Sequence, residues 1–267
     1  MFNSQQLSTT QAYSAYTNEP QLTVDNTRGY NRVVSFSDGS EQSYQLPQCR
    51  NSKRISVFGL GHGGALSAIC MAALGHKVIG VDLDQRRINA LNQGRTFSDE
   101  SGLPELLARI SSFHNLVATD DGFNAIKRTD SSLICVNDDI KCDSATSTEK
   151  LKALCEQIGM SLRYKDHYHN LVFCQNIDAE ILHTVLIPTL ESQSGKKASQ
   201  AFGISAFQGG KNVNRTIKDF YQPSQLTIQF LDKQSCQLTE QLFSGFRASV
   251  RRISWKSIDE IFADCEI

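Results

Sequence analysis

The sequence has no excess of charge of either sign, and it has no recognisable zinc or secretory motif. Its 267 residues contain 27 Lys and Arg against 28 Asp and Glu, so no net field attracts nucleic acid or an anionic membrane. The eight cysteines form no Cys-x-x-Cys pair and no His/Cys cluster at zinc spacing. The amino terminus lacks the basic and then apolar run of a secretory signal. We therefore expect reduced thiols, a cytoplasmic location, and neither nucleic acid nor metal as a ligand.

One uncharged stretch is long enough on paper to cross a bilayer. Residues 55–75 are 21 residues without Asp, Glu, Lys or Arg. Four glycines and His62 fall in its first half and divide the apolar residues into a strand-like run and a helix-like run. We expect a buried strand, turn and helix here, and no membrane span.

The first 50 residues differ from the rest in composition. They contain 23 Ser, Thr, Asn or Gln residues. Residues 1–28 have too little apolar surface to offset the entropy of ordering, so we predict a disordered tail. Residues 32–36 and 41–46 have the pattern of two strands joined by turn residues, which makes 32–46 a candidate β-hairpin.

After residue 54, short apolar strands alternate with amphipathic helices. The predicted strands are 55–59, 77–82, 132–136, 170–174, 201–206, 226–231 and 248–253. The predicted helices are 64–74, 85–92, 103–113, 149–163 and 179–190. This alternation predicts an α/β fold, a doubly wound and mostly parallel sheet with helices on both faces.

Residues 59–64, Gly-Leu-Gly-His-Gly-Gly, fit the pattern Gly-x-Gly-x-x-Gly. They leave a predicted strand and open a predicted helix, and Asp82 ends the next strand, which completes a dinucleotide-binding fingerprint. Gly59 permits the tight turn, Gly61 lets the backbone approach a pyrophosphate, and Gly64 lets the helix pack on the strand. A Rossmann-type scaffold that keeps these glycines for packing and holds no nucleotide remains an alternative.

The side chains around the turn bear on the kind of nucleotide. We expect Asp82 to accept hydrogen bonds from the ribose and to repel a 2′-phosphate, which favours NAD over NADP. Arg86 and Arg87 reduce this preference, because an arginine there can pair with a 2′-phosphate. We expect His62 to face solvent from the loop; a position over the pyrophosphate is the alternative.

Several segments resemble the UDP-glucose/GDP-mannose dehydrogenase family. They are residues 55–82, 91–94, 102–103, 133–136, 187–188, 194–198, 217–219 and 231–234, in order over about 53–253. Composition sets apart the polar segment over 1–50. The resemblance implies a Rossmann-type dinucleotide-binding domain over 51–254 and the start of the family's connecting helix over 255–267. It implies NAD, or its ADP-ribose or AMP portion, as the cofactor. The residues expected to bind it are Gly59, Leu60, Gly61, His62, Gly63, Gly64, Asp82 and Arg87.

The sequence departs from the family at the positions that perform its chemistry. The family holds an aldehyde on the cysteine of a Gly-Gly-x-Cys-x-Pro-Lys-Asp segment, which these 267 residues do not contain. Its Gly-Thr-Pro is replaced by Asn137-Asp138-Asp139, whose carboxylates oppose an anionic dinucleotide. Its Ser-Thr near the nicotinamide is replaced by Gln175-Asn176, and its Asn-Pro-Glu-Phe-Leu aligns with residues 207–211.

The resemblance and the departures together predict a homologue of the NAD-binding domain of nucleotide-sugar 6-dehydrogenases that has no catalytic residue and no activity alone. The resemblance implies a nucleotide-sensing or regulatory role, with a protein partner, near exopolysaccharide synthesis. Two alternatives remain open. One is a dehydrogenase component that oxidises a sugar-nucleotide C6 alcohol with NAD when a partner chain completes it. The other is an interaction module with an empty cleft.

Overall fold

The computed structural model describes residues 51–98, 100–111, 114–135, 144–208, 216–244, 246 and 248–255. The predicted tail over 1–28, the candidate hairpin over 32–46 and the predicted helix beyond Trp255 lie outside these residues. Within them, no helix is both long enough and apolar enough to span a membrane.

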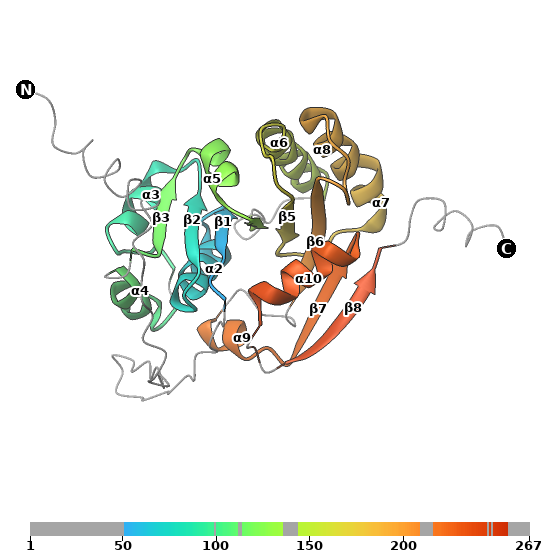
Figure 1. Ribbon diagram of the computed structural model, residues 1–267. Helices are drawn as coiled ribbons and strands as arrows, with labels where there is room; N and C mark the ends of the chain where they lie inside the picture. Colours follow the sequence, from blue (N-terminus) through green and yellow to red (C-terminus); the bar gives the residue numbers. More distant parts are fainter. Residues whose placement is uncertain are drawn as a thin grey trace, which may run out of the picture.

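A sheet of eight strands organises this part of the chain (Figure 1). The strands are β1 (Arg54–Phe58), β2 (Lys77–Val81), β3 (Leu116–Thr119), β4 (Ser131–Ile134), β5 (His169–Phe173), β6 (Phe202–Gln208), β7 (Gln225–Phe230) and β8 (Ser249–Ser254). Their order in the sheet is β3-β2-β1-β4-β5-β6-β7-β8, and only β6 and β7 pair antiparallel. The predicted mostly parallel sheet is confirmed, and its order reverses between β1 and β4, where nucleotides bind in such folds.

Helices cover both faces of the sheet, as predicted (Figure 1). They are α2 (His62–Ala73), α3 (Gln85–Asn92), α4 (Leu103–Ser111), α5 (Gly122–Arg128), α6 (Ser144–Leu162), α7 (Ala179–Ile181), η1 (Leu182–Leu186), α8 (Ile187–Ser194), α9 (Ile217–Tyr221) and α10 (Lys233–Leu242). Side chains of α2, α4, α9 and α10 share one hydrophobic cluster, and those of α5 to α8 share the other. Along β1, Ile55 and Val57 enter the first cluster and Phe58 enters the second.

The structure contains three short elements that the sequence pattern did not predict. They are β3, α5 and α9, of four, seven and five residues. Helix α6 also begins at Ser144, before the predicted start at 149. Elements this short carry too few apolar positions for a period to be recognised. Strand β3 is stabilised by parallel pairing with β2, in a register that runs from Val78 opposite Leu116 to Val81 opposite Thr119.

The helix predicted over 179–190 consists of α7, the π-helical turn η1 and α8 in succession. Pro188 is the second residue of α8, directly after the π turn. Proline has no N–H and its ring collides with the preceding turn of an α-helix, so the chain widens there into a π turn.

A network of buried polar side chains links the neighbouring strands β1, β4 and β5. Ser56 Oγ lies 2.6 Å from Ser132 Oγ, which lies 2.7 Å from His169 Nε2. His169 Nδ1 lies 3.1 Å from the carbonyl oxygen of Thr129. Because all of these side chains are buried, each polar atom depends on its partners in the network. Burial lowers the pKa of His169 to about 3, so the imidazole is neutral.

Candidate nucleotide-binding site

The glycine turn joins β1 to α2 at the point where the strand order reverses. Gly59 has φ +87°, a left-handed conformation that favours glycine, and its N–H donates to the carbonyl of Val81 at 2.8 Å. A Cβ atom added to Gly64 would lie 1.8 Å from the carbonyl oxygen of Gly59. The predicted roles of these two glycines in the turn and in close helix packing therefore have a steric basis.

Helix α2 begins two residues earlier than predicted, at His62. Its N-cap, Gly61, is extended and provides no side-chain cap, and the first turn contains no acidic residue. The first backbone N–H groups of a helix lack intrahelical partners and carry partial positive charge. This end of α2 is therefore suited to an anion such as a pyrophosphate.

Asp82 is turned toward the glycine turn. One carboxylate oxygen accepts the N–H of Leu60 at 2.6 Å, and the other accepts the N–H of Asp84 at 2.8 Å. Arg87 Nη1 lies 3.4 Å from the first oxygen. The Asp82 side chain is 10% exposed. A carboxylate has about four acceptor positions, so this one can hold the turn and still accept hydrogen bonds from a ribose.

The two arginines after Asp82 have different roles. Arg86 forms a two-pronged ion pair with Asp84, with Nε and Nη2 at 3.0 and 2.8 Å from the two oxygens. This guanidinium lowers the pKa of Asp84 to about 2. Arg87 instead lines the cavity beside Asp82. Of these two arginines, only Arg87 therefore borders the space beside Asp82, where we expect a ribose.

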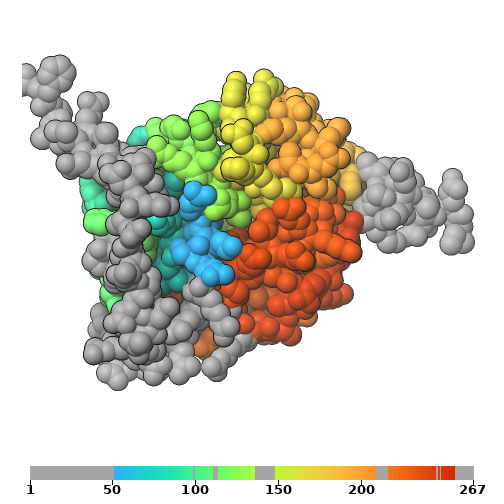
Figure 2. Space-filling model, viewed as in Figure 1, coloured from blue at the N-terminus to red at the C-terminus, as the bar shows by residue number. Residues whose placement is uncertain are grey.

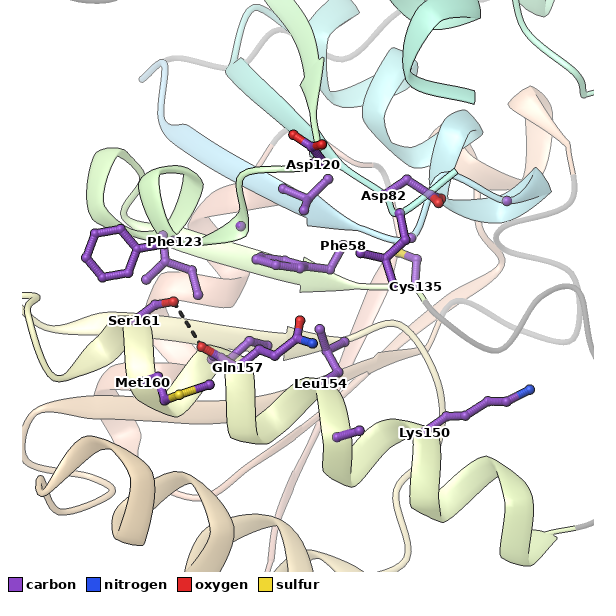
Figure 3. Close-up of a pocket in the computed structure, with 18 of the residues that line it drawn as sticks. Phe58, Asp82, Asp120, Phe123, Cys135, Lys150, Leu154, Gln157, Met160 and Ser161 are labelled. Carbon is purple, nitrogen blue, oxygen red and sulfur yellow. Dashed lines mark hydrogen bonds between the residues drawn. The ribbon is translucent and has the colours of Figure 1, made fainter. Parts of the chain in front are cut away.

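A cavity of about 720 Å³ opens beside the turn and continues between α5 and α6 (Figure 3). Its volume lies in the range of roughly 300–1,000 Å³ that is typical of small-molecule sites. The lining residues are Phe58, Gly59, Gly61, Val81, Asp82, Leu83, Arg87, Asp120, Gly122, Phe123, Ile126, Cys135, Lys150, Ala153, Leu154, Gln157, Ile158, Met160 and Ser161. In the space-filling view, the green segment with α5 adjoins the yellow segment with α6 (Figure 2).

Most of the cavity wall is apolar. Leu154 and Gln157 on α6 point toward Phe58 and Cys135 across the cavity (Figure 3). At its margin Leu83 is 82% exposed and Phe123 is 41% exposed. Exposed apolar groups around a concave site lose unfavourable contact with water when a flat aromatic base covers them.

The structure brings together four of the eight predicted site residues as cavity lining, namely Gly59, Gly61, Asp82 and Arg87. Leu60 contributes its N–H to Asp82. Gly63 and Gly64 are buried in the first turn of α2. Nucleotide contact by all eight residues stays a prediction.

The expectation that His62 faces solvent from a loop is wrong. His62 is the first residue of α2 and is only partly exposed, and its Nδ1 lies 3.0 Å from Ser98 Oγ. The helix starts here because Gly61, in extended conformation, acts as the N-cap.

Sequence reasoning missed the cavity residues contributed by α5 and α6. Leu154, Ile158 and Ser161 recur at helical spacing, which indicates one face of a helix. Nothing in that spacing indicates that the face borders a cleft. Phe123 and Ile126 were missed because α5 itself was not predicted.

The described residues that align with the family's nicotinamide and reacting-centre segments do not line the cavity. Gln175 and Asn176 follow β5 and are not among the cavity-lining residues. Phe207, at the position of the family's Asn, is 2% exposed and stacks on Phe243 with ring centroids 3.8 Å apart. Residues 137–139 and 209–211 lie outside the described residues.

A buried lysine joins the two helical walls of the cavity. Lys165 follows α6, and its Nζ donates to the carbonyl oxygens of Ile126, Lys127 and Thr129 at 3.1, 3.1 and 2.6 Å. These are carbonyls at the carboxyl end of α5, where the helix dipole favours a cation. Burial lowers the pKa of Lys165.

The described residues contain no group of three or more His, Cys, Asp or Glu side chains arranged to hold a metal ion. His167 is exposed, whereas His169 is buried in the polar network, so the two imidazoles do not share a site. Among the thiols, burial raises the pKa of Cys155 to about 12.

Comparison with known proteins gives consistent matches. The model of the UDP-glucose/GDP-mannose dehydrogenase family, NAD binding domain, matches residues 53–247. GDP-mannose 6-dehydrogenase of Pseudomonas syringae pv. syringae is 36% identical over 199 residues, which cover 74% of this chain and 45% of that protein. The enzyme of the same name from Pseudomonas aeruginosa is 33% identical over 214 residues, covering 80% and 49%. The chain thus spans about half the length of the curated relatives it matches.

Two solved structures resemble the fold. A ternary complex of GDP-mannose dehydrogenase from Pseudomonas aeruginosa has a TM-score of 0.71 at 33% identity, covering 79% of this chain and 49% of that one. A UDP-glucose dehydrogenase from Pyrobaculum islandicum has a TM-score of 0.68 at 21% identity, covering 82% and 50%. At that identity, the second match supports the fold alone.

Proposed function

Because this chain belongs to the UDP-glucose/GDP-mannose dehydrogenase family and contains its NAD-binding domain, we propose that it binds NAD mainly through the ADP-ribose portion and has no dehydrogenase activity alone. In this proposal, Gly59 to Gly64 bind the pyrophosphate, Asp82 accepts the ribose hydroxyls and Arg87 lies beside them. The chain then acts as a nucleotide-sensing or regulatory partner in exopolysaccharide biosynthesis.

One observation carries the proposal, namely the position of the cavity within the cleft. All of its described lining residues belong to β1, β2, α3, α5, α6 or the loops that follow β1 to β4. The lining runs from the glycine turn and Asp82, where the pyrophosphate and the ribose are proposed to bind, into the groove between α5 and α6. It includes neither Gln175 nor Asn176, which align with the family's nicotinamide contacts. Binding energy would therefore come from the base, the ribose and the phosphates, and little would come from the nicotinamide.

Two departures from the family, at positions that take part in its oxidation chemistry, support the proposed absence of activity. The buried, stacked ring of Phe207 replaces a polar residue of the family, and these 267 residues contain no Gly-Gly-x-Cys segment. These residues therefore do not include the family's nucleophilic cysteine, which holds the aldehyde between two oxidation steps.

Calorimetric titration with NAD, ADP-ribose and AMP tests the proposal. We expect NAD and ADP-ribose to bind with dissociation constants within about threefold of each other, since they share every contact named above. AMP lacks the second phosphate for the N-terminus of α2 and should bind more weakly. In parallel, the chain alone should not reduce NAD when GDP-mannose or UDP-glucose is supplied.

The alternatives give different results. Absence of binding for all three ligands would leave an interaction module with an empty cleft. Reduction of NAD that appears only after a separate sugar-nucleotide-binding chain is added would identify a dehydrogenase component. The match to the family's NAD-binding domain is the observation that favours this dehydrogenase component as the second candidate.

A further inference from the structure

We propose that Ser98 and Glu100 couple the phosphate-binding turn to helix α9, so that nucleotide binding at the turn stabilises α9. The inference rests on the proposed function, because the nucleotide at the turn is the ligand that it requires. It assigns Ser98 as a positioning residue that need not touch the nucleotide.

The first link joins the turn to Ser98. His62 is the first residue of α2, and its Nδ1 lies 3.0 Å from Ser98 Oγ. Ser98 is buried, and its hydroxyl oxygen also accepts the N–H of Glu100 at 3.3 Å. The hydroxyl therefore contacts both the amino end of α2 and the backbone of Glu100.

The second link joins Glu100 to α9. One carboxylate oxygen of Glu100 accepts the N–H of Ile217 at 2.9 Å, across 117 residues of sequence. Ile217 is the first residue of α9, so this N–H has no partner inside the helix. A carboxylate at the amino end of a helix also interacts favourably with its dipole. Glu100 therefore helps to stabilise α9 directly.

Helix α9 is suited to respond to such a contact. It has five residues, too few to be stable from helix propensity alone, so its stability depends on its neighbours. It packs on α2 through Tyr221, whose hydroxyl donates to the carbonyl of Cys70 at 2.9 Å. Short elements that depend on a few contacts open locally at a lower free energy than the core.

An anion at the turn would strengthen the chain of contacts. A pyrophosphate that accepts the N–H groups of the first turn of α2 would order the backbone at His62. The His62 side chain would then be held in place, and with it the hydrogen bond between its Nδ1 and the hydroxyl of Ser98. A more firmly held Ser98 would limit the motion of Glu100. The amino end of α9, which Glu100 caps, would then open less often.

Hydrogen exchange on the full chain, with and without saturating ADP-ribose, tests the coupling. We expect amides of the turn, over 59–66, to exchange more slowly with the ligand. We also expect the amides of α9 to slow by about fivefold, the lower end of common coupling between sites. In Ser98→Ala the turn should still be protected and the change at α9 should be lost. Ser98→Thr, which keeps the hydroxyl, should restore it.

A nearby serine provides the matched control. Ser101 is exposed. In Ser101→Ala, ADP-ribose should slow amide exchange at the turn and at α9 as much as it does in the unaltered chain. If Ser98→Ala does not fold, Glu100→Ala breaks the other link and should likewise abolish the response at α9.

The outcomes separate the two claims. Protection of the turn without a change at α9 would overturn the coupling and leave the proposed function intact. Protection of α9 that persists in Ser98→Ala and Glu100→Ala would show that the contact of Tyr221 with α2 is sufficient, and would also overturn the coupling. Absence of protection at the turn would overturn the proposed function, and the coupling with it.

Discussion

The carboxylate of Asp82 accepts the backbone N–H of Leu60 at 2.6 Å. The acid at the end of β2 therefore holds the glycine turn that follows β1, a role that is separate from binding a ribose. Because the proposed ribose contact uses the same side chain, we expect its removal to affect the turn as well as that contact.

Asp82→Ala should weaken ADP-ribose binding by about 1–3 kcal/mol, the cost of lost hydrogen bonds at a partly buried site. Calorimetry measures this change. Asp130→Ala is the control, because Asp130 forms an exposed ion pair with Arg54 and should not alter affinity. An affinity of Asp82→Ala equal to that of the unaltered chain would mean that the ribose lies elsewhere.

Gly64→Ala should destabilise the protein, although alanine usually stabilises a helix by about 1 kcal/mol relative to glycine. The new Cβ would lie 1.8 Å from the carbonyl oxygen of Gly59, so α2 must move away from β1. Denaturant unfolding should show lower stability, and nucleotide affinity should fall because the turn is displaced. A variant as stable as the parent would show that α2 can shift freely.

Ala153→Trp should reduce ADP-ribose affinity by at least about tenfold, or 1.4 kcal/mol. Ala153 is exposed on α6 and lines the cavity, so the indole would occupy space intended for the base while the core is left unchanged. Lys152→Trp places the same ring on the neighbouring exposed residue, which does not line the cavity. Equal affinities of these two variants would place the ligand outside this cavity.

The protein should lose stability as the pH falls below about 6.5, because the unfolded chain takes up a proton at His169 that the folded chain does not. Burial lowers the folded pKa of His169 from 6.5 to about 3. The free energy of unfolding then falls by about 1.4 kcal/mol per pH unit in this window from His169 alone. His76, whose pKa burial also lowers, adds to the loss.

His169→Gln separates this contribution from the others. The variant should be less stable at pH 7, because Ser132 and Thr129 lose their partner. Its stability should depend less steeply on pH between 6.5 and 4 than that of the unaltered chain. Thermal unfolding at a series of pH values measures this dependence. Parallel profiles for the variant and the unaltered chain would show that His169 does not cause the loss of stability at low pH.

The fold was largely predictable because its long elements carry strong patterns. The strand before the glycine turn, the turn itself and Asp82 lie close together in sequence, and their roles in the fold depend on local geometry. The family match confirms the resemblance and NAD as the cofactor of the domain. Strand order and the short elements β3, α5 and α9 were not predictable, because they depend on pairing and packing between distant segments.

The site was predictable only in part, for the same physical reason. Gly59 and Asp82 could be identified because a dinucleotide turn requires them at fixed spacing. The contact of His62 with Ser98 spans 36 residues, and no local preference indicates it. Leu154 and Gln157 belong to a helix that was predicted, but its position against α5 follows from tertiary packing.

Lys165 fastens the carboxyl end of α5 to the segment after α6, so the two helices cannot separate at that end. Separating α5 and α6 at this end would leave a buried ammonium group without its partners, so a change in the width of the cavity between them should cost less free energy at the end near the glycine turn.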